Sequence, residues 1–152
     1  MQPLLGAALT AVETTNVWGL PLGTISPGPA GSLYMLVQAG GTIAQYDVVS
    51  VTSAGSAVAL TKALADAGRK IGVAQVAIAN GSFGWVLVKG VGRANVLASA
   101  AADAALYTTA TAGSLDDEAT SQTLVRGLRL TTARAASNGD APCVMVIEPF
   151  AG

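Results

Sequence analysis

The chain repeats one order of strands and turns twice, and this repeat constrains the fold more than any other feature. Residues 36–88 run through an apolar strand, a glycine turn, an alternating strand, an Ala-Gly hairpin, a basic pair and a strand ending in Trp-Val-Leu-Val. Residues 87–146 follow the same order, with Gly55 matching Gly113 and Gly72 matching Gly127. Few residues are identical, but the turn residues recur. The sequence therefore predicts two similar β-units in tandem.

Hydrophobic periodicity supports a mainly β fold. From residue 32 onward the apolar residues alternate along short runs, and Asn80-Gly81 between two β-rich runs is the strongest hairpin signal. In "AQYDVVSVT" valines occupy both faces, so we expect this strand to be covered on each side. Residues 62–67 predict a short helical turn that ends before Gly68.

The second unit follows the same scheme. We expect separate strands at "FGWVLVKG", "RANVLASA", "LYTTATA", "TLVRGLRLTTA" and "CVMVIEPF", with Pro142 leading into the last one. Residues 32–152 therefore form a single β-domain, a compact β-barrel or β-sandwich, whose units lie at about 33–88 and 87–150. One or two short helices complete the prediction.

Residues 1–31 differ from the rest and predict an extended N-terminal arm. The run "ISPGPAG" cannot hold a helix, because proline lacks a backbone donor and biases the preceding residue toward extended geometry. An arm with apolar side chains must cover them, either on its own domain or on a neighbouring subunit or shell. The candidate contact residues are Leu4, Leu5, Leu9, Val12, Trp18 and Leu20.

Charge excludes several classes of partner. Charged residues make up 11% of the chain, against about 25% in a typical soluble domain. This deficit indicates either burial of surface against other subunits or a surface rich in Ser, Thr and Gly. The net charge is −1, and the only basic pair is Arg69-Lys70, so we expect no nucleic-acid binding. Because the chain has neither a signal sequence nor an apolar run of about 18 residues, we expect no membrane association.

The side chains that usually carry out catalysis are scarce. Histidine is absent, and Cys143 is the single cysteine, in an apolar run where we expect a buried, inert thiol. Asp116-Asp117-Glu118 is the one acidic cluster, but it lacks the alternating ligands and central glycine of a calcium loop. We expect it to be a solvated turn. The sequence predicts no enzyme activity, no cofactor and no metal site.

Aromatic residues leave a carbohydrate-binding interpretation open. Phe83 and Trp85 alternate along one strand, and Tyr34, Tyr46 and Tyr107 are further candidates for stacking on a sugar. The alternative is that these aromatics pack in the core of a small barrel, which we favour.

Three runs of the sequence carry a resemblance to a known family. "GVAQVAIANGSFGWVLVKG", "NVLASAAADAALYTTATAGSLDD" and "LVRGLRLTTARAA" resemble the head decoration proteins of tailed bacteriophages, also called cement or head-stabilisation proteins. The resemblance covers about residues 32–150 and extends weakly to 20–24. It implies a compact β fold, assembly as a homotrimer, and a position on the outer surface of the capsid, bound to the major capsid protein. It also implies synthesis in the host bacterial cytoplasm and a capsid-gripping role for residues 1–31.

Two other functions compete with capsid decoration. One is another virion part, such as the base of a head fibre, a tail tip or a spike module. The chain stops at "EPFAG" directly after its last expected strand, which disfavours a long fibre. The other is a carbohydrate-binding adhesion module built on the aromatic residues named above.

Overall fold

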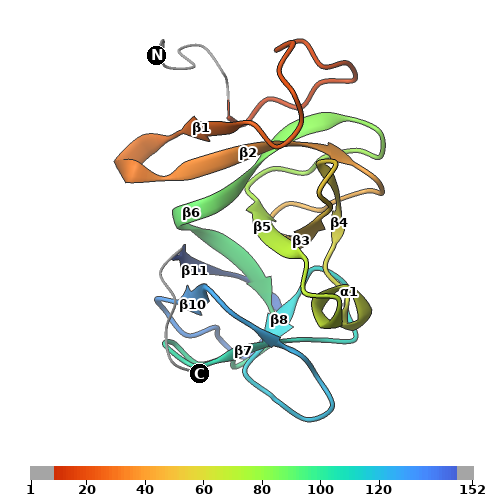
Figure 1. Ribbon diagram of the computed structural model, residues 1–152. Helices are drawn as coiled ribbons and strands as arrows, with labels where there is room; N and C mark the ends of the chain where they lie inside the picture. The colour runs from red at the N-terminus through yellow and green to blue at the C-terminus, as the bar shows by residue number, and fades with distance from the viewer. Residues whose placement is uncertain (1–8, 147–152) are drawn as a thin grey trace.

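The computed structural model describes residues 9–146 and is mainly β, with few helices and a closed β-barrel (Figure 1). Its strands are β1 (Ile25–Pro27), β2 (Leu33–Ala39), β3 (Val48–Val51), β4 (Ser56–Ala59), β5 (Lys70–Ala74), β6 (Phe83–Val96), β7 (Leu106–Thr108), β8 (Leu115–Asp116), β9 (Leu124–Val125), β10 (Leu128–Leu130) and β11 (Gly139–Met145). Its helices are the single turn η1 (Pro29–Gly31) and α1 (Lys62–Asp66).

The first unit is a closed barrel. β2 pairs in parallel with β4, β4 pairs with β3, β3 with β5 and β5 with β6, the last three pairings being antiparallel. β6 then pairs antiparallel with β2 and closes the ring. Closure leaves none of these strands with an unpaired edge along the ring. The predicted β-barrel is confirmed.

The second unit repeats the same pairing order. The second half of β6 takes the place of β2, and it pairs in parallel with β8, as β2 does with β4. β8 pairs with β7, β7 with β9, β10 with β11, and β11 returns to β6. β9 and β10 together occupy the position of β5. The tandem β-units are confirmed, and β6 is common to both, running from one to the other in Figure 1.

The sharing of β6 corrects the prediction of separate strands at "FGWVLVKG" and "RANVLASA". β6 is continuous over 14 residues. Gly90 lies in its middle with φ +109, where a Cβ would stand 2.7 Å from Cβ of Ser32. The glycine therefore allows a close approach and a bend within the strand, rather than the turn that its sequence suggests.

Two further details differ from the sequence prediction. Gly72 lies inside β5 opposite Val49, whereas Gly127 has φ +87 and separates β9 from β10, so the two glycines that the repeat matches have different conformations. Pro142 lies inside β11 rather than before it, and its carbonyl accepts from Thr131 N at 2.9 Å. Because the pairing of β10 with β11 ends at Leu130 and Cys143, the missing N–H of Pro142 removes no hydrogen bond from that strand pair.

Two apolar clusters fill the molecule. One lies within the first unit and includes Val49 and Val86, while the other includes Val48 and Leu87 and continues into the second unit through Cys143. Neighbouring residues of β3 and β6 thus face different clusters. This arrangement confirms the expectation that the β3 strand is covered on both sides. Burying each such Val or Leu side chain contributes about 1.5–3 kcal/mol.

The predicted helical turn is also confirmed. α1 is capped by Thr61, whose hydroxyl oxygen accepts from Leu64 N at 3.4 Å. Gly68 follows the helix with φ +67, the left-handed conformation that commonly ends a helix. The chain then turns directly into β5.

Candidate functional site

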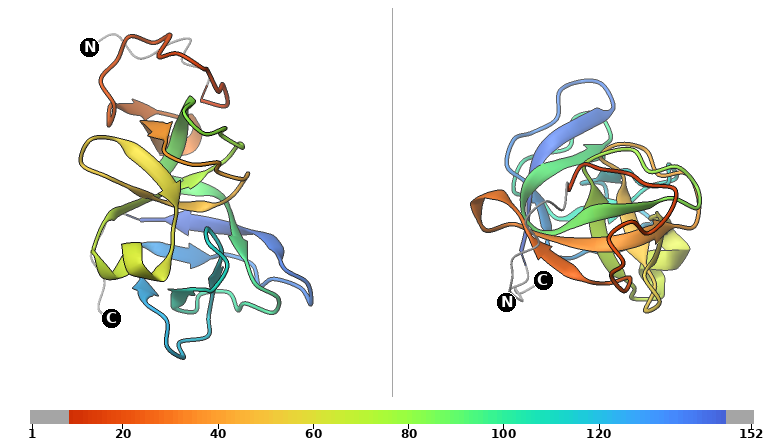
Figure 2. Two further views of the ribbon diagram at one scale, coloured as in Figure 1. Left: turned by 90° about the vertical axis from the view of Figure 1, so that its right-hand side faces the viewer. Right: turned by 90° about the horizontal axis from the view of Figure 1, so that it is seen from above.

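The described part of the N-terminal segment, residues 9–31, lies against the first barrel (Figure 2). Glu13 and Phe83 exchange two backbone hydrogen bonds, of 3.0 and 2.8 Å. Further along, β1 pairs antiparallel with β2, and Leu36 N donates to Thr24 O at 2.9 Å. The segment therefore adds main-chain pairs to the two strands that close the barrel.

An aromatic contact reinforces this attachment. Trp18 meets Trp85 of β6 edge to face, with ring centroids 5.7 Å apart and an interplanar angle of 76°. Trp85 is fully buried, whereas Trp18 is half-buried. Asn16 Nδ2 donates to Leu20 O at 2.6 Å and folds the segment around Trp18. Such aromatic pairs contribute about 0.5–1.5 kcal/mol beyond their buried area.

The candidate arm residues divide into two groups. Leu4 and Leu5 lie outside the described residues. The other four, Leu9, Val12, Trp18 and Leu20, are each partly buried, and Val12 packs against the core cluster of the first barrel. For residues 9–31 the structure thus gives docking on the chain's own domain, one of the two alternatives that the sequence left open. Capsid contact by these residues stays a prediction.

Two apolar side chains of the same segment project into solvent. Val17 is 60% exposed and Ile25 is 40% exposed. Neither is among the candidate residues derived from sequence. The alternation of β1 would have marked Ile25 as facing away from the barrel, but this short strand is recognisable only once its pairing with β2 is known.

The aromatic residues do not build a platform around Trp85. Its exposed fraction is 0%, so neither face of the indole is open to a sugar ring. Trp85 is buried, as the core-packing interpretation expects, but it packs against Trp18 of the N-terminal segment and lies in neither core cluster. Tyr34 is half-buried and packs against the larger core cluster, and this burial raises the pKa of its phenol above the usual 10.0.

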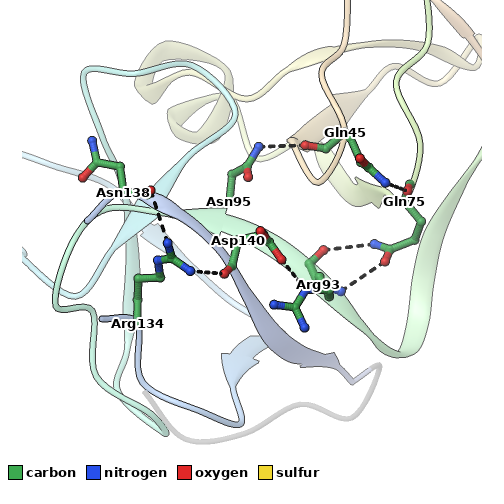
Figure 3. Close-up of polar contacts among 7 residues, drawn as sticks. All are labelled: Gln45, Gln75, Arg93, Asn95, Arg134, Asn138 and Asp140. Carbon is green, nitrogen blue, oxygen red and sulfur yellow. Dashed lines mark hydrogen bonds and ion pairs between the residues drawn. The ribbon is translucent and has the colours of Figure 1, made fainter. Parts of the chain in front are cut away.

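Polar side chains join the two units along β6 (Figure 3). Gln75 pairs with the backbone of Arg93, donating from Nε2 to Arg93 O at 3.0 Å and accepting from Arg93 N at 3.1 Å. Gln45 Nε2 donates to Gln75 O at 3.1 Å, and Asn95 Nδ2 donates to Gln45 O at 2.9 Å. These bonds fix the loops of the first unit to the half of β6 that belongs to the second.

Asp47 is the buried polar residue at this junction. Its carboxylate accepts from Ala44 N at 2.9 Å and from Asn95 Nδ2 at 3.0 Å. The bond to Ala44 is the local backbone contact expected of an aspartate beside a turn. Gly113, in the hairpin of the second unit, lies so close that a Cβ there would stand 2.5 Å from Cγ of Asp47. The junction therefore requires glycine at position 113.

An ion pair between Arg93 and Asp140 ties β6 to β11 at the surface. The Arg93 guanidinium holds the pKa of the Asp140 carboxyl below its ordinary value. Arg134 lies beside it and donates to the carbonyl of Asp140 at 2.9 Å (Figure 3). It also donates to the carbonyl of Ser137 at 2.8 Å. The charges and hydrogen-bond donors of this polar face are paired within the protein, so the face serves to hold β6 and β11 together.

Two other surfaces carry charge that is not neutralised within the described residues. One is a groove beside α1, lined by Arg69, Lys70 and Arg126. The other is the end of β8 with the loop that follows it, where Asp116 and Glu118 line a small hollow. Sequence reasoning noted the basic pair and the acidic cluster separately. It missed Arg126, which is far from the basic pair in sequence and joins it only through the fold.

Within residues 9–146, no helix is long and apolar enough to cross a membrane. The same residues contain no group of three or more His, Cys, Asp or Glu side chains placed to hold a metal ion. The chain matches no protein-family model, and searches of curated proteins and of solved structures find no match.

Proposed function

We propose that the protein is a non-enzymatic virion structural protein that decorates and stabilises the outer surface of a tailed-phage capsid. Its partners would be the major capsid protein and copies of itself. The resemblance over residues 32–150 supports this assignment. The structural observation that supports it best is the N-terminal segment, which is fixed to a closed barrel yet leaves Val17 60% exposed and Ile25 40% exposed.

The physical logic of such a role is linkage. A ligand that binds the assembled shell but not its separate subunits shifts the equilibrium toward the assembled state. Many equivalent weak contacts on a symmetric lattice then add up to a large effect. A closed barrel that shares a strand and part of its core with a second β-unit suits this task, because a rigid ligand loses little conformational entropy when it binds.

The apolar contact to the shell is assigned to the N-terminal segment. Residues 1–8 contain Leu4 and Leu5, and the docked part adds Val17 and Ile25. Contiguous exposed apolar patches mark interaction surfaces, so this assignment requires these side chains to act together on the shell. Trp18 has a different role, since it anchors the segment to the barrel through Trp85.

The test is binding of the purified protein to undecorated heads, measured by co-sedimentation. The informative variants are a deletion of residues 1–8 and Val17→Asp, because neither removes the Trp18 anchor. Val91→Asp is the matched control, since Val91 is 68% exposed on β6 and lies outside the segment. We expect the deletion and Val17→Asp to lose binding and the control to retain it. Equal binding by all the variants would contradict the assignment of the segment.

A head-fibre base, tail-tip or spike module is the alternative within the virion. It would use the same two β-units but in few copies per particle, so copy number separates it from decoration. The carbohydrate-binding alternative has lost its central candidate, because Trp85 is buried.

A further inference from the structure

Several cationic side chains in the described part of the chain are held by internal partners. Lys62 and Arg93 form ion pairs with Asp66 and Asp140, and Arg134 donates to backbone carbonyls. In contrast, three exposed basic residues that lie together have no side-chain hydrogen bond or ion pair within residues 9–146. These are Arg69, Lys70 and Arg126.

These three cations line one groove. A hollow of about 550 Å³ is lined by Arg69 and Lys70, together with the backbone of Gly55 and Gly68 and the hydroxyl residue Thr52. A neighbouring hollow of about 260 Å³ shares Gly68 and Arg69 and adds Arg126. The fold creates this convergence. Gly68 ends α1 and places the basic pair at the start of β5, while Gly127 interrupts the facing strand directly after Arg126.

The loop after β8 carries the opposite charge and is equally unneutralised. Asp117 accepts from Ala101 N at 3.0 Å, and Glu118 accepts from Thr120 N at 2.9 Å, but no cation pairs with either carboxylate in the described residues. Burial raises the pKa of Asp116, and the neighbouring charges of Asp117 and Glu118 act in the same direction. Charge of one sign is thus concentrated here.

We propose that the protein associates head to tail with copies of itself, with the acidic loop 116–118 of one copy docked in the basic groove of the next. Both halves of the contact lie on the same chain, and their charges are complementary in sign and number. The acidic hollow shares no lining residue with either of the two basic hollows. Such a contact is heterologous, and it closes into a ring when the rotation between copies allows it.

A second copy fits this groove better than a nucleic acid does. Three cations neutralise few phosphates, whereas nucleic-acid sites commonly use about 6–10 phosphate contacts. The chain has 8 basic and 9 acidic residues, and these two surfaces hold three of each sign. The inference rests on the self-association included in the proposed function and names the surfaces that carry it.

The experiment measures the mass of the purified full-length protein by sedimentation velocity over a range of concentrations. Salt is varied from about 0.01 M to about 1 M, where the Debye length falls from about 30 Å to about 3 Å. We expect an oligomer at low salt that dissociates as salt rises. The variants R69E/K70E and D116K/E118K reverse one surface each, and each should weaken association at least about tenfold. K89E is the control, because Lys89 is an exposed lysine outside the groove and its reversal should leave the oligomer intact.

A mixture of the two charge-reversal variants provides the decisive test. Each retains one native surface, so an equimolar mixture should form complexes that neither variant forms alone. Circular dichroism checks that every variant is folded, and the milder D116N/E118Q replaces D116K/E118K if that protein fails to fold. A wild-type protein that is monomeric at every concentration and salt, or reversal variants that assemble like wild type, would overturn the inference. Head binding is measured separately, so monomeric variants that still bind heads would leave capsid decoration standing.

Discussion

The indole of Trp18 meets the indole of Trp85 at a centroid distance of 5.7 Å and an interplanar angle of 76°. Trp85 is fully buried but belongs to neither core cluster. It lies on the face of β6 opposite Val86, which packs in the first-barrel cluster, so the N-terminal segment covers the outer face of this strand. The Glu13–Phe83 backbone pair lies on the same segment. Residues 9–31 are therefore part of the folded domain, and removing them changes more than a surface contact.

Replacing Trp18 with alanine should lower the free energy of unfolding by about 1–3 kcal/mol, because the variant loses the aromatic contact and uncovers Trp85. Urea unfolding followed by circular dichroism measures this loss. Val17→Ala is the control, since its side chain is 60% exposed and its substitution should change stability by less than about 0.5 kcal/mol. Equal stabilities for the two variants would show that Trp18 does not anchor the segment.

Substitution of Gly113 by alanine should destabilise the junction between the units. Gly113 has φ +81, and a Cβ there would stand 2.5 Å from Cγ of Asp47. Gly81→Ala is a matched control, because Gly81 has φ +80 but no neighbouring atom within 4 Å of the place where a Cβ would stand. Both variants carry the same backbone strain, so the extra loss in Gly113→Ala, about 1–3 kcal/mol, reports the steric contact with Asp47. Thermal unfolding compares the two, and equal losses would contradict the close packing of this junction.

Cys143 should be unreactive in the folded protein and should affect stability at alkaline pH. It is fully buried, and burial raises the pKa of its thiol from 9.0 to about 12. The unfolded chain ionises near pH 9 while the folded chain stays protonated, so the stabilisation is complete below pH 9 and is lost as the pH rises toward 12. Unfolding free energies of the wild type should therefore fall more steeply over this range than those of Cys143→Ala. Parallel curves, or rapid alkylation of the native thiol at pH 8, would contradict this account.

Two aspartates should respond to acid in opposite ways. The pKa of Asp140 is lowered by Arg93, so its contribution to stability is present above its ordinary value of 3.8 and is lost as the pH falls through the folded-state pKa. The pKa of Asp116 is raised by burial, so its carboxylate destabilises the folded state as the pH rises above 3.8. At neutral pH, Asp140→Asn should be less stable than the wild type and Asp116→Asn as stable or more so. Urea unfolding at pH 7 and pH 3 measures both, and a common sign for the two variants would contradict the assigned environments.

The repeat predicts the order of the strands because turn residues and alternation are local properties of the sequence. Gly55 and Gly113 do occupy equivalent hairpins, with φ values of +83 and +81. The continuity of β6 could not be predicted, since "KGVG" has the composition of a turn, and only the approach of Ser32 to Gly90 explains the glycine. Alternation indicates which face of the sheet a side chain occupies, but not which strands pair with each other. The parallel pairs β2–β4 and β6–β8 therefore could not be predicted either.

The candidate surfaces were less predictable than the fold. The apolar composition of residues 1–31 indicates that the segment must dock, but not on what, and only the contact with Trp85 decides this for the described part. The basic groove depends on the approach of Arg126 to Arg69, two residues separated by most of the second unit. Such convergence follows from long-range pairing, which local sequence patterns do not encode.

The central claim, that the protein decorates capsids, is tested most directly by its copy number in the virion. Quantitative mass spectrometry of purified virions, from the phage whose genome carries this sequence, gives the ratio of this chain to the major capsid protein. Capsid decoration predicts a copy number comparable to that of the shell protein. A handful of copies would instead support a fibre, tail-tip or spike part, and complete absence from the particle would contradict the structural role altogether.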